Sequence, residues 1–454
     1  MRGSLGFALV CVVAACGTGH DTEDEAGDKH DSRGEPSSES KVMSAHGERA
    51  ERKLTYYEDV KPIIDAKCTQ CHVDGGIGPL PLTTFEEVDL VKELVALDVS
   101  QGKMPPWRAN AALNFYVGER RLTPEQKDTI VRWVKQGGKE GNPDKEPPPP
   151  PAVERGLSRI DGTMQFEQPF TPSGKEVDEY RCVPLKWPYE ETKYVTGLSV
   201  EPDRRDMVHH GVVYFVQPDG AAALLERDAE TEEVGYPCTG VTVGGGAWLT
   251  SYEPGGYGQD FPGGLGFEVK PGSLFVVQMH YNTANGAFPD QSRLDYKVED
   301  HVDRIGRVQL LMNPLWIRGE MQIPAGEPDV MHAYAMQPVR SEAAARDGLA
   351  LYWVDLHMHV LGRSGVIGLV RADGTREGLL DIPDWSFAWQ ETYILQKPVT
   401  LYAGDQLYVE CHFDNSPEHQ TMIDGQLPPP RDVNWGDHTS DEMCLGAVLL
   451  GPPE

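Results

Sequence analysis

The sequence lacks several features that define common classes of protein. Beyond its N-terminus it has no run of about 18 or more apolar residues, so we predict no internal transmembrane helix. Positive charge is scarce, with 41 basic against 71 acidic residues, which argues against nucleic acid or an anionic membrane surface as a partner. Strong helical patterns are nearly absent after residue 153. The apolar content is ordinary, however, and 454 residues favour two to four folded domains.

The N-terminus has the features of an export signal. Residues 1–16 combine one arginine, an apolar run and small residues that end at Cys16. The segment 13–16 resembles a bacterial lipobox. This resemblance implies that Cys16 is acylated in an outer-membrane lipoprotein, which faces the periplasm or the cell surface; an ordinary secretory signal is the alternative. Residues 17–52 are polar and charged, which predicts a disordered acidic tether.

Residues 53–142 are predicted to form a small helical domain that binds haem. The segment CTQCH places Cys68, Cys71 and His72 in a C-x-x-C-H pattern. In an exported protein this pattern indicates covalent attachment of a c-type haem, with His72 as an iron ligand. A redox or zinc-binding C-x-x-C is the rival, but no βαβ pattern and no second thiol pair lie nearby. The segment GKMPPW resembles the methionine-ligand loop of class I cytochromes c, which implies Met104 as the sixth ligand.

A proline-rich linker, residues 143–152, separates this domain from the rest of the chain. Residues 153–454 contain short apolar runs between Gly, Pro and Asp turns, such as GSLFVVQMHYN and QLYVECHFDN. These runs predict two antiparallel β-sandwiches of jelly-roll type, residues 153–318 and 319–454. The predicted fold class is therefore multidomain, with a small all-α cytochrome c domain followed by two all-β sandwich domains.

Two of the β-rich runs carry paired histidines. YWVDLHMHVLG predicts a strand with Tyr352 and Val354 on an apolar face and with His357 and His359 on the other. Since residues two apart on a strand point the same way, both imidazoles can bind one metal ion. DMVHHGVVYF has adjacent histidines, 209 and 210. Joint ligation by that pair needs a bulge or a strand end, because neighbours on a strand face opposite sides.

Two further segments complete the set of motifs. LFVVQMHYN carries His280 with Gln278 on the same face, and TSDEMCLG carries Met443. In order and rough spacing, the four motifs resemble the copper type II, ascorbate-dependent monooxygenases, the family of peptidylglycine α-hydroxylating monooxygenase and dopamine β-monooxygenase. The resemblance covers residues 153–454 and implies two copper ions. One copper would be bound by His209, His210 and His280, and the other by His357, His359 and Met443.

The chemistry of these side chains agrees with copper. Imidazole binds Cu(II) and Cu(I), whereas a thioether favours Cu(I), the state that must meet O2. An all-imidazole site suits a centre that passes electrons. Zinc on three histidines is the rival at either site, but zinc has little use for Met443. The resemblance thus implies His357, His359 and Met443 as the catalytic set.

The cysteines predict two disulfides. Of the eight in the sequence, four remain once the leader, the acylated residue and the haem motif are set aside: Cys182, Cys238, Cys411 and Cys444. In an oxidising compartment they are expected to pair, and the sequence alone leaves three pairings open. The family resemblance implies Cys411–Cys444, next to the methionine ligand, and then Cys182–Cys238.

Several positions depart from the family pattern. Asp355 stands where the peptide-hydroxylating enzyme has an arginine that helps to hold the substrate carboxylate, and Leu445 and Ala447 replace an expected Asn and Tyr. These changes argue against a peptide C-terminus as the substrate, and nothing supports a catecholamine. Asp355 either suits a cationic or hydroxylated substrate or is simply solvated. Tyr180 matches a substrate-site tyrosine of the family or is a core residue. Tyr180, Gln278 and Asp355 are therefore candidates for electron relay or substrate contact.

Together the motifs predict a copper monooxygenase that hydroxylates a C–H bond of a small organic substrate with O2. Electrons from an external donor would enter at the haem and pass to the copper at His209, His210 and His280. One alternative is a non-catalytic copper- and haem-binding electron carrier on the cell surface. Another is a cytochrome fused to a binding module with vestigial histidines.

Overall fold

The computed structural model describes residues 52–453 apart from short gaps, and the chain from Lys53 onward forms one compact unit. The predicted lipidation site Cys16, the signal segment, nearly all of the tether and part of the proline-rich linker lie outside the described residues. The gaps are Gly75, Ile77, 111–115, 149–155, 239–245, 254–255, Tyr257, 284–285, 340–345, Ala388, 423–426 and 437–439.

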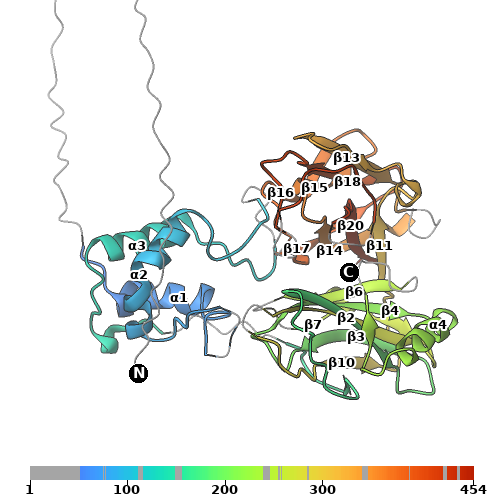
Figure 1. Ribbon diagram of the computed structural model, residues 1–454, viewed down its shortest axis with the longest axis horizontal. Helices are drawn as coiled ribbons and strands as arrows, with labels where there is room; N and C mark the ends of the chain where they lie inside the picture. Colours follow the sequence, from blue (N-terminus) through green and yellow to red (C-terminus); the bar gives the residue numbers. More distant parts are fainter. Residues whose placement is uncertain are drawn as a thin grey trace, which may run out of the picture. The chain divides into compact units, whose positions relative to one another are not determined.

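The helical region, residues 53–148, is built from elements whose starts follow from the sequence. Thr84 and Thr123 each cap a helix through a capping box with the Glu or Gln three residues later. Tyr56 and Trp133 are fully buried in the core that joins these elements. The elements, seen in Figure 1, are η1 (Tyr56–Val60), α1 (Lys61–Lys67), α2 (Phe85–Ser100), α3 (Pro124–Lys135) and η2 (Pro143–Lys145).

The first β region, residues 156–305, contains two antiparallel sheets that enclose one core. Phe275 from one sheet and Val195 from the other are both completely buried in this core. One sheet has the order β1-β10-β3-β7 with β8 beside β3, and the other has the order β5-β2-β9-β4-β6. The bounds are β1 (Gly162–Gln165), β2 (Asp178–Lys186), β3 (Lys193–Glu201), β4 (Val208–Val216), α4 (Pro218–Ala229), β5 (Tyr236–Pro237), β6 (Ala247–Tyr252), β7 (Gln259–Asp260), η3 (Pro262–Gly264), β8 (Phe267–Val269), β9 (Leu274–Asn282) and β10 (Arg293–Glu299).

The second β region, residues 306–453, contains two four-stranded antiparallel sheets around a second core. Their orders are β11-β20-β14-β17 and β13-β18-β15-β16, and β12 pairs with β19 in a small separate ladder. The bounds are β11 (Arg307–Leu311), η4 (Trp316–Arg318), β12 (Gln322–Ile323), β13 (Val330–Met336), β14 (Leu349–His357), β15 (Gly362–Val370), β16 (Arg376–Ile382), β17 (Tyr393–Leu401), β18 (Gln406–Phe413), β19 (Val433–Asn434) and β20 (Leu445–Gly451).

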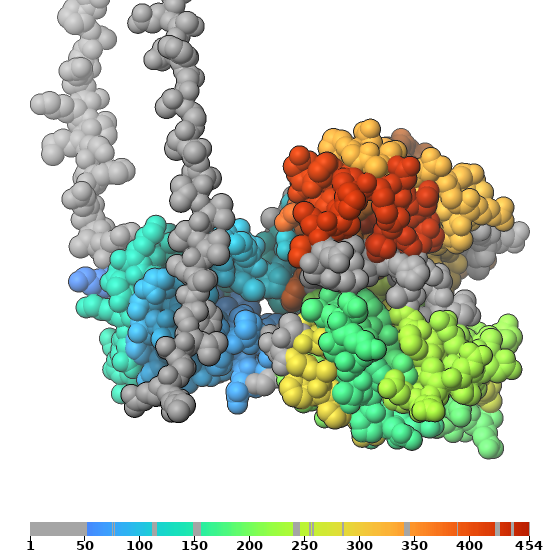
Figure 2. Space-filling view, viewed as in Figure 1, coloured from blue at the N-terminus to red at the C-terminus, as the bar shows by residue number. Residues whose placement is uncertain are grey.

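Strand β14, which ends at the H-x-H motif, is buried along its whole length because its two faces meet different cores. Leu351 and Val354 pack in the core of the second β region, whereas Ala350 and Tyr352 pack in the core of the first. The two β regions therefore adjoin, as the space-filling view shows in green to yellow and in orange to red (Figure 2). The prediction that Tyr352 shares a face with Val354 is wrong, since a bulge shifts the register between Leu351 and Trp353.

The structure contradicts the predicted fold class, a small all-α cytochrome c domain followed by two all-β sandwich domains. The chain is mostly β, with four α-helices in the described part, one of them in the first β region. No separate all-α domain is present in the described residues, because Lys53–Glu454 forms a single compact unit. The physical reason lies in segment 105–121, where Ala109 and Tyr116 are buried in the core of the second β region instead of a helical core.

Both disulfides that the family resemblance implied are present. Cys182 is bonded to Cys238 and Cys411 to Cys444. Neither Cys68 nor Cys71 is part of a disulfide in the structure. As regards membrane spans, the described helices are all too short or too polar to cross a bilayer.

Candidate metal centres

Three histidines converge on the sheet that contains β4 and β9. The register between these strands shifts between Val208 and His210, so a bulge allows adjacent histidines to turn toward one point, as joint ligation required. His210 is paired with His280 across the strands. The Nδ1 atom of His210 lies 3.3 Å from that of His209 and 3.1 Å from that of His280. All three side chains offer a nitrogen within 4.8 Å of the others.

The protonation state of this cluster suits a metal ion. Burial, and to a smaller extent the neighbouring His280, lower the pKa of His209 to about 4. Burial also holds the pKa of His210 well below its usual value. Both imidazoles are therefore neutral near pH 7, and only a neutral imidazole has a lone pair for a metal.

Asp178 orients the third histidine. Its Oδ1 lies 2.9 Å from His280 Nε2 and also accepts a hydrogen bond from Asn282. The hydrogen bond with His280 lowers the pKa of Asp178, so the carboxylate is ionised. An Nε2–H that donates to Asp178 leaves the Nδ1 lone pair directed at the other two histidines. Tyr180, opposite His280 on β2, stacks on that ring with centroids 4.3 Å apart.

We therefore predict that Asp178→Asn weakens copper binding at the three-histidine cluster by about 10- to 100-fold, since carboxylates behind ligating histidines have effects of this size. Competition with a copper chelator measures the change. Asp300→Asn is the matched control, because Asp300 is exposed and pairs with Lys193. Unchanged copper affinity in Asp178→Asn would show that the carboxylate does not support a ligand.

The second cluster lies where β14 ends. The His357 and His359 rings are 5.1 Å apart between centroids and nearly perpendicular, at 86°. His359 lies beyond the last residue of the strand rather than on it. Burial, and to a smaller extent His359, lower the pKa of His357 to about 3. His357 Nδ1 is 2.5 Å from Gln390 Oε1, whereas its buried Nε2 has no hydrogen-bond partner in the described part of the chain. This nitrogen is available to a metal ion.

Segment 441–443, which contains Met443 and is called the methionine segment below, is hydrogen-bonded to the residues that directly follow β14. Glu442 accepts hydrogen bonds from the backbone N–H groups of His359 at 2.8 Å and of Leu361 at 2.6 Å. His359 Nδ1 lies 3.0 Å from the carbonyl oxygen of Asp441. Met443 is fully buried, and β20, which starts two residues later, pairs with the end of β14. Segment 441–443 and the H-x-H motif are thus held together.

Two residues of the first β region lie on strands next to the clusters: the aromatic Trp248 on β6 and the polar Gln278 on β9. Trp248 of β6 lies with its ring 6.4 Å from that of His357, and β6 is also paired with β4, which carries the first cluster. In Figure 1, β6 is the strand of the first β region drawn next to the second. Gln278 is buried, and its amide contacts Cys238 Sγ at 3.7 Å, so it faces the disulfide.

One of the two predicted alternatives for Asp355 was a solvated side chain, and the structure shows that this alternative is wrong. It is buried and accepts a hydrogen bond from Thr392 Oγ1 at 2.7 Å, and burial raises its pKa well above the usual value. Thr392 Oγ1 lies 3.1 Å from Ser251 Oγ, whose hydroxyl in turn bonds Glu253. A hydrogen-bonded row of side chains therefore crosses from the first β region to β14.

Glu253 in this row gives a prediction about pH. Desolvation by burial raises its pKa from 4.5 to about 7. The folded state therefore binds this proton more tightly than the unfolded state, and the free energy of unfolding falls as pH rises from about 4.5 to 7. We expect Glu253→Gln to remove about 1–2 kcal/mol of that decline, measured by urea unfolding at several pH values. Exposed Glu268→Gln is the control, and an identical pH profile for Glu253→Gln and wild type would refute the prediction.

The C-x-x-C-H motif lies at the end of α1 and in the turns that follow. Cys68 and Cys71 are partly buried, and His72 Nδ1 is 2.7 Å from the carbonyl oxygen of Leu80. Such a bond fixes the ring and directs Nε2 away from the backbone. Met104 is 40% exposed. Other large apolar side chains of this region are exposed as well, namely Leu80, Leu90, Leu94 and Leu97.

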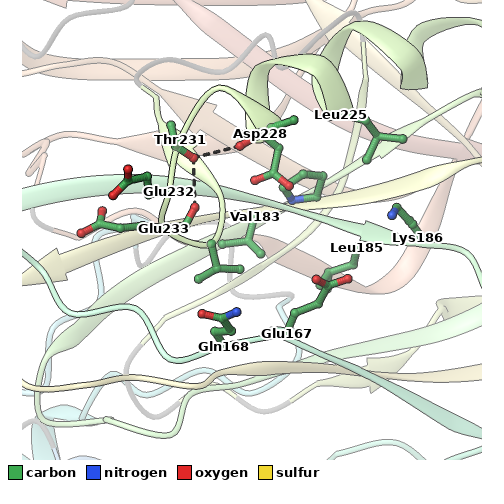
Figure 3. Close-up of a pocket in the computed structure, with 13 residues that line it drawn as sticks. Glu167, Gln168, Val183, Leu185, Lys186, Leu225, Asp228, Thr231, Glu232 and Glu233 are labelled. Carbon is green, nitrogen blue, oxygen red and sulfur yellow. Dashed lines mark hydrogen bonds between the residues drawn. The ribbon is translucent and has the colours of Figure 1, made fainter.

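A pocket of about 240 Å³ opens elsewhere in the first β region (Figure 3). Val183 and Leu185 of β2 form its floor, and acidic side chains such as Asp228 and Glu233 surround it, with Lys186 the basic residue of its lining. Burial raises the pKa of Asp228. The lining contains none of the predicted copper ligands, so we assign this pocket no part in the metal chemistry.

Comparison with known proteins agrees with this geometry. Residues 309–449 match the family described as "Copper type II ascorbate-dependent monooxygenase, C-terminal domain". The chain is 24% identical to DBH-like monooxygenase protein 1 of Gallus gallus over 288 residues and to the protein of the same name of Homo sapiens over 290 residues. It is 27% identical over 198 residues to dopamine beta-hydroxylase of Canis lupus familiaris, covering 42% of this chain and 29% of that one.

These matches cover part of the chain and part of each relative. The alignments to the two DBH-like proteins cover 60% of this chain and 44% of each relative, so the chain spans less than half of their length. Residues 309–449 are similar to the C-terminal domain of the copper type II ascorbate-dependent monooxygenases.

Sequence reasoning missed the side chains that support the predicted ligands. Asp178 is two residues before Tyr180, and this D-x-Y spacing on a strand could have suggested that both face His280. Glu442 lies inside the DEMC motif itself. Gln390 had no signal, because it approaches His357 from a separate segment after Trp385.

Proposed function

We propose that this chain is an exported copper-dependent monooxygenase that hydroxylates a C–H bond of a small organic substrate. The observation that carries the proposal is the presence of two separate histidine clusters, one beside a buried methionine, in a chain similar to this enzyme class. O2, two electrons and two protons would convert R–H into R–OH and water.

The donor sets fit copper. His209, His210 and His280 would hold one ion through neutral imidazole nitrogens, with Asp178 behind the third ligand. His357, His359 and Met443 would hold the other, and a thioether ligand suits Cu(I) better than zinc. Bound copper would supply O2 binding and one-electron chemistry. The protein's own part is to keep the imidazoles neutral, to orient His280 through Asp178, and to fix the methionine segment through Glu442.

The C-x-x-C-H motif fits a covalently bound haem. Two cysteines outside any disulfide precede a histidine whose Nδ1 lies near a backbone carbonyl oxygen, and the helical region has exposed leucines, which are apolar surface of the kind that a bound porphyrin covers. In this proposal His72 and Met104 are the iron ligands and electrons from an external donor enter here. Attachment through an acylated Cys16 to the outer membrane is part of the same proposal and rests on the N-terminal sequence.

The substrate is proposed only as a small organic molecule. Asp355 replaces the arginine of the peptide-hydroxylating relatives and is buried and bonded to Thr392. An aspartate in this place argues against a substrate carboxylate there. We propose no direct contact between Asp355 and substrate, because its carboxyl group is buried and its Oδ2 accepts a hydrogen bond from Thr392.

The test uses the full chain matured in a host that exports it and attaches haem. Reduced protein with two coppers should consume O2 in the presence of a substrate library and place one atom of 18O2 in a hydroxylated product. Rapid electron exchange without product from any substrate would instead favour the alternative, a copper- and haem-binding electron carrier. Protein that takes up no copper would overturn both.

A further inference from the structure

The described parts of the segment between α2 and α3, residues 105–110 and 116–121, are hydrogen-bonded to the second β region. The backbone N–H of Asn110 donates to Asp381 O at 2.7 Å and that of Val117 to Ile394 O at 2.8 Å. The hydroxyl of Tyr116 donates to the carbonyl oxygen of Leu379 at 2.6 Å. This segment therefore has a fixed register against β16 and β17, the latter a neighbour of the strand that ends at His357.

Arg120 is the centre of this contact. Its guanidinium forms a buried ion pair with Glu391. It also lies 5.5 Å from the ring centroid of Trp107 and 5.5 Å from that of Trp389. A cation between two indole rings is stabilised most strongly where water is excluded. The buried ion pair also keeps the guanidinium beside both tryptophans. Separating the pair would leave a lone buried charge, which is costly.

Beyond Trp389 the contacts reach a proposed copper ligand. The next residue, Gln390, places its Oε1 2.5 Å from His357 Nδ1. Trp107, Arg120, Trp389 and Gln390 therefore form a continuous series of polarisable and hydrogen-bonding groups that ends at His357.

The other end of this series lies at the proposed haem site. Lys67, which immediately precedes Cys68, donates to the carbonyl oxygen of Glu119 at 2.6 Å, and Glu119 precedes Arg120. Met104 is three residues before Trp107 in the chain. Arg120 is thus one residue away from a contact with Lys67, the neighbour of Cys68, and Trp107 is three residues away from Met104.

We propose that Trp107, Arg120 and Trp389 form the route by which electrons pass from the haem to the metal at His357, His359 and Met443. This inference rests on the proposed function. It differs from the expectation that electrons enter at the three-histidine cluster. In each transfer, one electron leaves ferrous haem, which becomes ferric, and Cu(II) at the His357 site becomes Cu(I). The ferrous haem is regenerated by an external one-electron reductant. The side chains on the route fill the space between the two sites, and they do not themselves change oxidation state.

A rival route leads to the first cluster. Tyr252 of β6 is paired with Gly211, the residue after His210. It is buried, and the thiol of Cys71 contributes to raising its pKa, after burial itself. A test must therefore compare both routes.

The experiment measures electron transfer in the holoprotein by stopped flow. Anaerobic protein with ferrous haem and Cu(II) is followed by loss of ferrous haem absorbance and of the Cu(II) paramagnetic resonance signal. Trp389→Leu and Trp107→Leu should each slow the transfer by about tenfold or more, with copper content, haem spectrum and both reduction potentials unchanged. Trp389→Phe, which keeps an aromatic ring, should restore most of the rate. Trp316→Leu is the control, since Trp316 is buried in the same core and packs against His332, Tyr334 and Trp435.

Four outcomes would overturn the proposal. One is an unchanged rate in both Trp389→Leu and Trp107→Leu. The second is a slowing in Tyr252→Leu alone, which would assign entry to the three-histidine cluster. The third is that wild-type protein from a host that exports it and attaches haem contains no haem or no copper. That result would refute the proposed function together with the route. A slow rate accompanied by lost copper would show a structural role and would also count against the route.

Discussion

Replacing His357 with alanine should remove one of two copper ions per chain and lower product formation by about a thousandfold or more. His357 offers a buried nitrogen that has no partner in the described residues, and its neighbour His359 is fixed to the methionine segment through Asp441 and Glu442. An imidazole and a thioether alone cannot hold the ion as three ligands do. Copper analysis and turnover with 18O2 measure the two effects.

The matched control for this substitution is His412→Ala. His412 lies on β18, where its two nitrogens are 3.1 Å from Asp329 and 3.3 Å from Glu410. It is predicted to keep both coppers and normal turnover. The account fails if the His357→Ala and His210→Ala variants both retain two coppers and full activity.

The Cys411–Cys444 disulfide should matter for both stability and copper. Replacing both cysteines with alanine opens a loop of sequence separation 33, which costs about 4 kcal/mol of unfolding free energy by loop entropy. Cys444 follows Met443 directly, so the thioether loses its covalent support as well. We expect denaturant unfolding to report the stability loss and chelator competition to report weaker Cu(I) binding by about tenfold or more.

The second disulfide, Cys182–Cys238, serves as a comparison that separates the effect on stability from the effect on Cu(I) binding. Removal of Cys182–Cys238, with sequence separation 56, should cost a similar amount, about 4 kcal/mol. Neither of its cysteines is next to Met443 in sequence, although both share a buried cluster with it, so Cu(I) affinity at the His357 site should fall less than in the variant that lacks Cys411 and Cys444. Equal loss of Cu(I) affinity in the two double variants would mean that the methionine segment does not depend on its adjacent bridge.

The ligand positions could be predicted from the sequence because each depends on local geometry. Strand periodicity required a bulge or a strand end for His209 and His210 to bind one ion together, and the structure has a register shift there. The H-x-H pair needed no long-range information. Only the family resemblance, and no spacing rule, implied which cysteines pair, and both bridges are present. Whether these residues bind copper stays a prediction.

The fold class could not be predicted from local patterns. The segment around Trp107 and Tyr116 has no strong periodicity, and its partners at β16 and β17 are more than 250 residues away in sequence. Which core an apolar side chain joins is decided by such distant contacts, so a separate helical domain was the wrong conclusion. Asp355 likewise gave no sign of burial on its own, since its partner Thr392 comes from another segment.

The most direct test of the central claim is the metal content and oxygen chemistry of the mature holoprotein. We expect two coppers and one haem iron per chain, and substrate-dependent transfer of one 18O atom into product. Finding no copper after loading with Cu(II), in protein whose fold and disulfides are intact, would contradict the account and leave the histidine clusters as structural features of a binding module.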